Sequence, residues 1–171
     1  MQQGILEELN FIKKLLEIEV HINKYMKILN KYNTKLKIDE INIFENDIGI
    51  KLPKDYISFL LEFNGGKPML NNCQVIISDV NWIYGMFNEP EWASLYNAMY
   101  TFVGRIPGWY IPIARDSGGN QYLMSLYEGN YGVIAFWKHE FELMTGDASQ
   151  YFDNMTKVSD SFSEFLENLK E

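Results

Sequence analysis

Apolar residues recur at steps of three or four through the first part of the chain, at Ile5, Leu9, Ile12, Leu16, Ile22, Met26 and Leu29. This spacing predicts an amphipathic helix that ends in the polar run 30–34. A second helix is predicted from Asp39, a suitable N-cap, to about Ile48. Gly49 follows it, and we expect this residue to end the helix in a left-handed conformation.

The third predicted helix has clear start and stop signals. Pro53 is expected at its first helical position, where the missing N–H of proline costs nothing. The apolar face of this helix consists of Tyr56, Phe59, Leu60 and Phe63. The run Asn64–Gly66 should stop the helix, because asparagine and glycine tolerate a positive φ.

The middle of the chain changes to extended patterns. Residues 73–77 and 80–87 are predicted as strands or extended segments, and a helix is predicted from Glu89 to Phe102. Residues 110–115, 121–127 and 133–137 then form a predicted three-strand meander, with turns at 116–120 and 128–132. Pro112 lies within its first strand, which favours an edge position or the first residues of the strand.

The last predicted helix begins near Ser161. Its hydroxyl is expected to cap the helix while Glu164, three residues later, completes a capping box. The buried face is predicted to consist of Phe162, Phe165, Leu166 and Leu169. Helices first, then strands, then a closing helix indicate an α+β fold with a mostly antiparallel sheet (the meander at 110–137) packed against N-terminal and C-terminal helices. We expect one domain over residues 1–171, with a leading helix at 1–37 and a body at 43–169.

Composition narrows the class of protein. The chain has 171 residues, of which 47% are hydrophobic, and a formal net charge of −8. Residues 1–37 hold seven Lys and four Glu, a net +3, whereas residues 38–171 hold eight basic and nineteen acidic residues, a net −11. The acidity argues against nucleic acid or anionic lipid as a partner and is compatible with a basic protein partner.

Nothing in the sequence indicates a membrane or secreted protein. The longest stretch without a charged residue, 92–104, is thirteen residues long, whereas a spanning helix needs about 20. The N-terminus has acidic residues early and no signal-peptide pattern. The single cysteine, Cys73, fits a reducing compartment and is expected to be a small core residue. We therefore expect a cytoplasmic protein.

The search for chemical sites gives weak candidates. His139 and Glu140 beside Glu142 could bind a metal weakly, but we interpret them as a solvated strand end. The run 116–120 joins two strands, so it is interpreted as a hairpin turn and not as a phosphate cradle. An enzymatic alternative is a hydrolase that uses Asp116, His139 and Glu140. No motif calls for a cofactor or a structural metal.

Four sequence runs nevertheless form a distinctive set: Glu45 to Gly66, Ile111 to Asn120, Gly132 to Glu140 and Ser161 to Leu166. In this order they resemble the motifs of the SUKH superfamily (Smi/Knr-like domains), which includes a fungal cell-wall synthesis regulator and bacterial immunity proteins. Each matched residue also has a structural explanation, so we expect these positions to maintain the fold. They are Glu45, Gly49, Leu52, Pro53, Tyr56, Phe59, Asn64, Gly65, Gly66, Pro112, Asp116, Gly118, Gly119, Asn120, Trp137, Phe162, Phe165 and Leu166.

The resemblance implies a binding module without a shared catalytic site, and specifically a bacterial immunity protein that binds and neutralises a cognate toxin, such as a nuclease. A regulatory or scaffold domain like the fungal relatives is the alternative. Residues 1–37 and 70–108 carry no family motif, so the partner and the oligomeric state stay open. The expected contact residues are acidic side chains together with tryptophan anchors: Glu45, Asp47, Asp55, Glu62, Asp116, Glu140 and Glu142, with Trp82, Trp92 and Trp109.

Overall fold

The computed structural model describes residues 13, 28–29, 34–87, 90–142 and 152–171. Most of the predicted leading helix and the start of the helix predicted at Glu89 lie outside these residues. At the end of the leading helix the prediction is wrong, because Ile28–Leu29 form a strand, β1, which pairs with β2, Lys67–Pro68. Pairing with a distant segment overrides the helical spacing there.

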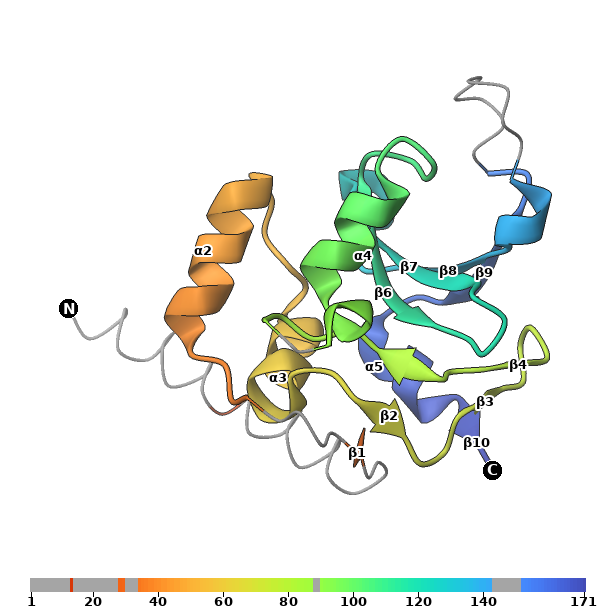
Figure 1. Ribbon diagram of the computed structural model, residues 1–171, viewed down its shortest axis with the longest axis horizontal. Coiled ribbons are helices and arrows are strands. Elements are labelled where there is room, and N and C mark those ends of the chain that lie inside the picture. Colours follow the sequence, from red (N-terminus) through yellow and green to blue (C-terminus); the bar gives the residue numbers. More distant parts are fainter. Residues whose placement is uncertain (1–12, 14–27, 30–33, 88–89, 143–151) are drawn as a thin grey trace.

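A five-stranded antiparallel sheet forms the centre of the protein (Figure 1). Its strands, in spatial order, are β5 (Trp82–Ile83), β6 (Tyr110–Arg115), β7 (Gln121–Ser125), β8 (Ile134–Trp137) and β9 (Met155–Ser159). The predicted meander is therefore confirmed, with one strand added on each side. Pro112 lies at an irregularity of β6, beyond the two residues that β5 covers, where its missing N–H is tolerated.

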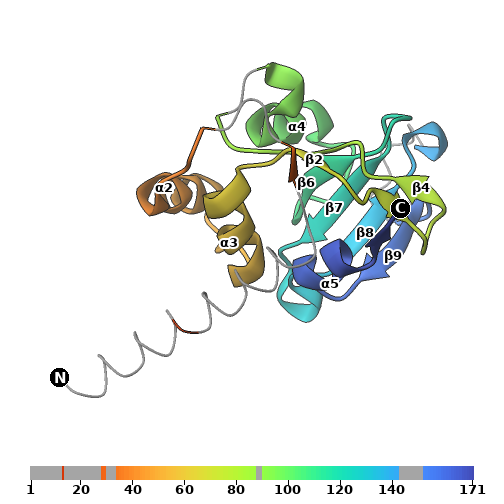
Figure 2. The same cartoon turned by 90° about the horizontal axis from the view of Figure 1, so that it is seen from below.

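Helices cover both faces of this sheet. Figure 2 shows α4, Leu95–Phe102, on one face and α5, Phe162–Glu167, on the other. The helices α2 (Ile38–Ile48) and α3 (Lys54–Phe63) lie to one side of the sheet, and α3 contacts α5. Among the described residues, no helix is long and apolar enough to cross a membrane. The predicted α+β class with a mostly antiparallel sheet is confirmed.

The helix boundaries follow local capping chemistry. Gly49 ends α2 with a φ of 72°, as predicted, but Lys37 and not Asp39 is its N-cap. The carboxylate of Glu40 accepts a hydrogen bond from the backbone N–H of Lys37 at 2.8 Å, which satisfies this end of the helix. Pro53 precedes α3 as its N-cap, one position earlier than predicted.

The C-terminal helix also shows its predicted cap with one change. The Ser161 hydroxyl accepts a hydrogen bond from the backbone N–H of Glu164 at 3.1 Å. The Glu164 carboxylate, however, accepts from the backbone N–H of Asp160 and not from that of Ser161. The second hydrogen bond of the capping box therefore comes from Asp160, one residue before the N-cap.

Two segments of the middle region differ from prediction. The predicted strand at 73–77 is a hairpin of β3 (Asn72–Cys73) and β4 (Ser78–Asp79), with a turn between them, and β10 (Leu169–Lys170) pairs with β3. The described part of the predicted helix at 89–102 is a 3-10 helix, Glu91–Ala93, followed by α4. Ser94 is extended between them and accepts a hydrogen bond from the N–H of Asn97, which restarts the helix.

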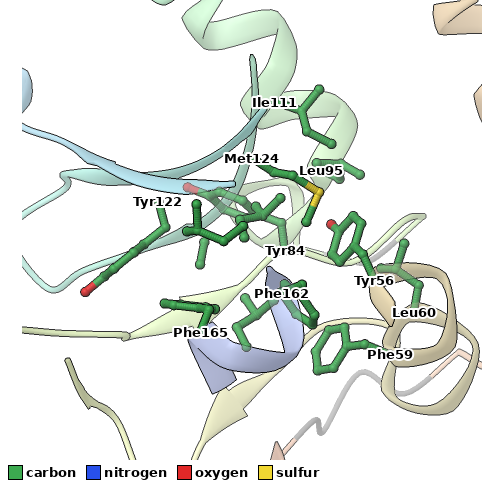
Figure 3. Close-up of a cluster of buried hydrophobic side chains, with 14 of the residues drawn as sticks. Tyr56, Phe59, Leu60, Tyr84, Leu95, Ile111, Tyr122, Met124, Phe162 and Phe165 are labelled. Atoms are coloured by element: carbon green, nitrogen blue, oxygen red, sulfur yellow. The ribbon is translucent and has the colours of Figure 1, made fainter. Parts of the chain in front are cut away.

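The main core lies between the sheet, α3 and α5 (Figure 3). Aromatic rings dominate it: Phe162 packs edge-on against both Tyr56 (4.9 Å between centroids) and Phe59 (5.0 Å). The predicted buried face of the last helix is confirmed for Phe162, Phe165 and Leu166, whereas Leu169, also buried, lies in β10 and not in the helix. A smaller core on the α4 face consists of Phe102, Ile106, Tyr110, Leu123, Ala135 and Trp137.

Candidate protein-binding surface

Glu45, expected at the surface, is buried and holds two elements together. One of its carboxylate oxygens accepts the backbone N–H of Leu52 at 2.8 Å, and the other accepts Lys51 Nζ at 2.6 Å. Only 5% of Glu45 is exposed. Glu45 is therefore not a contact residue, contrary to expectation. Its carboxylate ties the end of α2 to residues 51–52, which precede α3.

Asp116 likewise is not a contact residue, because its carboxylate is used within the chain. It is buried, and its two oxygens accept hydrogen bonds from the backbone and side-chain nitrogens of Asn120 and from the Ser78 hydroxyl. Asn120 Oδ1 in turn lies 2.9 Å from His139 Nδ1. Asn120 thus links Asp116 to His139, and both of these residues belong to the hydrolase alternative. The Asn120 side chain also shapes the turn between β6 and β7.

The helix stop at Asn64 and the glycines after it form a clamp on a distant segment. Asn64 Nδ2 donates to the carbonyls of Thr34 (2.7 Å) and Met86 (2.9 Å), and its Oδ1 accepts from Met86 N–H (2.8 Å). A Cβ at Gly65 would lie 2.6 Å from the backbone nitrogen of Gly85, so only glycine permits this approach. This motif therefore joins α3 to residues 83–86, a role that a helix stop alone does not reveal.

The three expected tryptophan anchors have different environments. Trp82 is 6% exposed and belongs to the main core. Because its ring is enclosed, it is not an anchor for a partner. Trp92 is 40% exposed and packs edge-on against Trp82, with 5.0 Å between centroids. Trp109 is 41% exposed. Trp92 and Trp109 therefore remain available to a partner.

The other acidic candidates on the helices are scattered. Asp47 is exposed on α2, and Glu62 is half-buried on α3. Asp55 is half-buried, and its carboxylate accepts backbone N–H groups from Tyr56 and from Ser163 on α5. Asp55 therefore ties two helices together.

A cluster of exposed aromatic rings does form around Trp109. Its ring lies 5.7 Å from that of Tyr127 and 6.2 Å from that of Phe152. Tyr127 is 56% exposed and Phe152 is 45% exposed. Large apolar rings that stay in solvent on three separate segments are typical of a contact site.

An acidic hollow adjoins this cluster, since Phe152 and Asp153 are consecutive. Its volume is about 480 Å3, and its lining includes Glu140 and Glu142 from the expected contact residues. Glu140 is exposed, whereas Glu142 forms a bidentate pair with Arg105, with Nη2 to Oε2 at 2.7 Å. The remaining lining residues are Lys138, Phe141, Asp153, Asn154 and Thr156. We call Trp109, Tyr127, Glu140, Phe141, Phe152 and Asp153 the aromatic–acidic rim.

Sequence reasoning found only Trp109 and Glu140 of this rim. Tyr127, Phe152 and Asp153 lie in connections, and Phe141 ends a short 3-10 helix, His139–Phe141. These segments are too short for periodicity to mark a side chain as exposed. Tyr127 was predicted as the last residue of the strand 121–127, whereas β7 ends at Ser125 and leaves Tyr127 in the connection that follows.

Two ionisable side chains in the core are protonated at neutral pH. Cys73 is buried, and burial raises the pKa of its thiol, which keeps it protonated at neutral pH. Within the described ranges, no group of three His, Cys, Asp or Glu side chains could hold a metal ion. Burial likewise raises the pKa of Tyr84, to about 12, so this phenol is protonated too.

Comparison with known proteins places the fold and its motifs in a family. Over 178 aligned residues, the chain is 29% identical to the SPbeta prophage-derived uncharacterized protein YokK of Bacillus subtilis (strain 168), with 92% of this chain and 83% of that protein covered. The model of the SMI1 / KNR4 family (SUKH-1) matches residues 35–168, which include all four motifs described above. On this match, the chain belongs to the SMI1 / KNR4 family (SUKH-1).

Proposed function

We propose that this protein is a non-catalytic immunity protein that binds and neutralises a cognate protein toxin with a basic surface. The aromatic–acidic rim is the observation that carries this proposal. It combines exposed rings, which supply apolar contact area, with the exposed carboxylates of Glu140 and Asp153. Interfaces are enriched in aromatic residues, and opposite charges around them accelerate association.

The charge distribution of the chain supports a basic partner. Residues 38–171 carry a net charge of −11 and include every residue of the rim. A toxin that grips phosphate groups, such as a nuclease, needs a positive surface, which a rim of this charge would attract and cover. The description of YokK as prophage-derived supports a search for a toxin gene beside the gene of this chain.

The first experiment tests whether a partner exists. The product of the neighbouring reading frame is co-expressed with this chain, and both co-purification and protection of the host cell are measured. We expect a stable complex and full protection. A toxic neighbour that this chain neither binds nor neutralises would refute the proposal, and binding of several unrelated host proteins instead would indicate a regulatory scaffold.

The second experiment locates the surface. Trp109→Ala combined with Glu140→Lys removes a central ring and reverses one charge, and we expect loss of protection without loss of folding. The matched control is Tyr100→Ala combined with Glu62→Lys, since Tyr100 is 81% exposed and both control residues lie outside the rim. Equal protection by the two double variants would exclude the rim as the contact surface.

The third experiment tests the non-catalytic part of the proposal. His139→Ala removes the imidazole of the hydrolase alternative. We expect this variant to protect as well as the wild type, because neutralisation by binding needs no proton transfer at this position. Loss of protection together with unchanged toxin affinity would show that catalysis is required.

A further inference from the structure

The chain contains two arginines, and both lie against aromatic rings. The guanidinium carbon of Arg105 is 4.9 Å from the centroid of Phe102 and 5.7 Å from that of Trp137. The Glu142 carboxylate accepts hydrogen bonds from Arg105 Nε at 2.9 Å and from Arg105 Nη2 at 2.7 Å. Arg105 therefore has an aromatic ring at its face and a carboxylate paired with its Nε and Nη2.

Arg115 has the same aromatic setting without the carboxylate. Its guanidinium carbon lies 4.8 Å from the centroid of Trp92, and Trp82 is its cross-strand neighbour. Its Nε is enclosed and has no hydrogen-bond partner among the described residues, and none of the ion pairs found there includes it. The next residue, Asp116, already uses both oxygens on Asn120 and Ser78.

An arginine in this environment has an unfavourable free energy when no anion is bound to it. Burial of part of the guanidinium removes water from it, and stacking on a ring fixes its plane. The plane of the fork is therefore fixed before any ligand arrives, and less entropy is lost when a planar anion binds. The side chain stays partly exposed, so its terminal amino groups remain the accessible end.

We propose that Arg115, stacked on Trp92, binds a side-chain carboxylate of a protein partner. This inference rests on the proposed function, because the partner in question is the toxin. Arg115, Gln121 and Trp137 are directly opposed in the sheet register, so Arg115 lies on the same face as the Arg105–Glu142 pair beside the rim. Tryptophan and arginine are the residue types most often found at interface hot spots.

This site would give the interface a fixed orientation. The rim is acidic and attracts a basic surface, whereas the guanidinium of Arg115 donates hydrogen bonds and favours an acidic group. A partner that presents both charges in the matching arrangement binds in one register, and a uniformly basic protein is penalised at Arg115. Arg115 therefore selects the cognate toxin among basic proteins.

The first test needs no toxin. The full chain is labelled with nitrogen-15, and the two arginine Nε–H signals are assigned with Arg115→Lys. Acetyl-aspartate amide is then titrated, with acetyl-asparagine amide as the uncharged control. We expect a saturable shift of the Arg115 signal in about the millimolar range, with the Arg105 signal unmoved. An unmoved Arg115 signal, or an equal shift of both, would overturn the proposal.

The second test uses the captured toxin. Arg115→Lys keeps the charge but loses the planar fork, and we expect about a tenfold or greater loss of affinity. Arg105→Lys is the matched control, since its carboxylate partner is within the chain, and its affinity should stay within about twofold of the wild type. Equal affinities for all three proteins would overturn the inference and leave the proposed function standing. Failure of the wild type to bind any toxin refutes the proposed function, and the titration then decides whether Arg115 is an anion site.

Discussion

Asn64 makes the sharpest prediction for the stability of this fold. It adopts a left-handed conformation, with φ 47° and ψ 50°, and is 1% exposed. Its side chain forms two hydrogen bonds with the backbone of Met86, which is fully buried, and one with the carbonyl of Thr34. Removal of the side chain would leave the N–H and C=O of Met86 enclosed and without this partner.

The variant Asn64→Gly isolates the side chain from the backbone conformation. Glycine adopts a positive φ readily, so the turn itself is preserved. Two buried backbone groups lose their partner, at about 1–3 kcal/mol each. We therefore expect the free energy of unfolding to fall by about 2–6 kcal/mol, which corresponds to a fall in Tm of about 10 °C for a chain of this length.

The variant Asn64→Asp keeps the size of the side chain and changes only its chemistry. One carboxylate oxygen can still accept from Met86 N–H, but the other then faces the carbonyls of Thr34 and Met86. At pH 7 we expect a destabilisation at least as large as that of the glycine variant. The two carbonyls hold the pKa of the new carboxyl above its usual range, so the deficit should shrink as pH falls and the group becomes protonated.

Urea unfolding followed by tryptophan fluorescence measures these differences. The matched control is Asn46→Asp, because Asn46 is exposed on α2 and its replacement should change stability by only about 0.5 kcal/mol or less. Stability within about 1 kcal/mol of the wild type for both Asn64 variants would refute the reasoning, since it would show that the Met86 backbone does not depend on Asn64.

Three further predictions follow from buried polar groups. The Tyr56 hydroxyl is buried and has no hydrogen-bond partner among the described residues, so Tyr56→Phe should raise stability by about 1 kcal/mol in urea unfolding, and a loss of stability would reveal a partner. Glu45→Ala should cost about 2–3 kcal/mol while Lys51→Ala, at the exposed end of the pair, should cost less than about 1 kcal/mol; equal costs would contradict the assigned role of Glu45. Burial raises the pKa of the Cys73 thiol above its usual value and that of Tyr84 to about 12. Their contribution to the free energy of unfolding is therefore fully present below about pH 9 and is lost as pH rises. A free energy of unfolding that is unchanged between about pH 8 and pH 11 would contradict this.

The elements that sequence patterns predicted well are those with local signals. Gly49, Asn64 and Ser161 mark helix ends by their own conformation or hydrogen bonds, and the meander is marked by turns. The strand β10 was missed and the strand predicted at 73–77 had the wrong bounds, since β3 and β10 pair with each other across the chain. Such pairing leaves no periodic trace in two residues.

The candidate surface was harder to predict for a related reason. Glu45, Asp116 and Trp82 were chosen by residue type, yet tertiary contacts decide whether a carboxylate or an indole is buried. Glu45 is buried because the chain turns back after α2 and brings the Leu52 N–H to its carboxylate. Trp92, by contrast, stays exposed because it rests on the edge of Trp82 and not inside the core.

The contact of α3 with α5 has a consequence for the synthesis of the protein. The Asp55 carboxylate accepts from the backbone N–H of Ser163, 108 residues later, and Phe162 packs between Tyr56 and Phe59. The aromatic centre of the core is therefore completed only after Phe162 has been synthesised. Contacts of such long sequence separation slow folding, because the chain must close a large loop first. A nascent chain, or one truncated before Phe162, lacks this closure, so the aromatic centre of the core stays incomplete until the α5 segment has emerged from the ribosome.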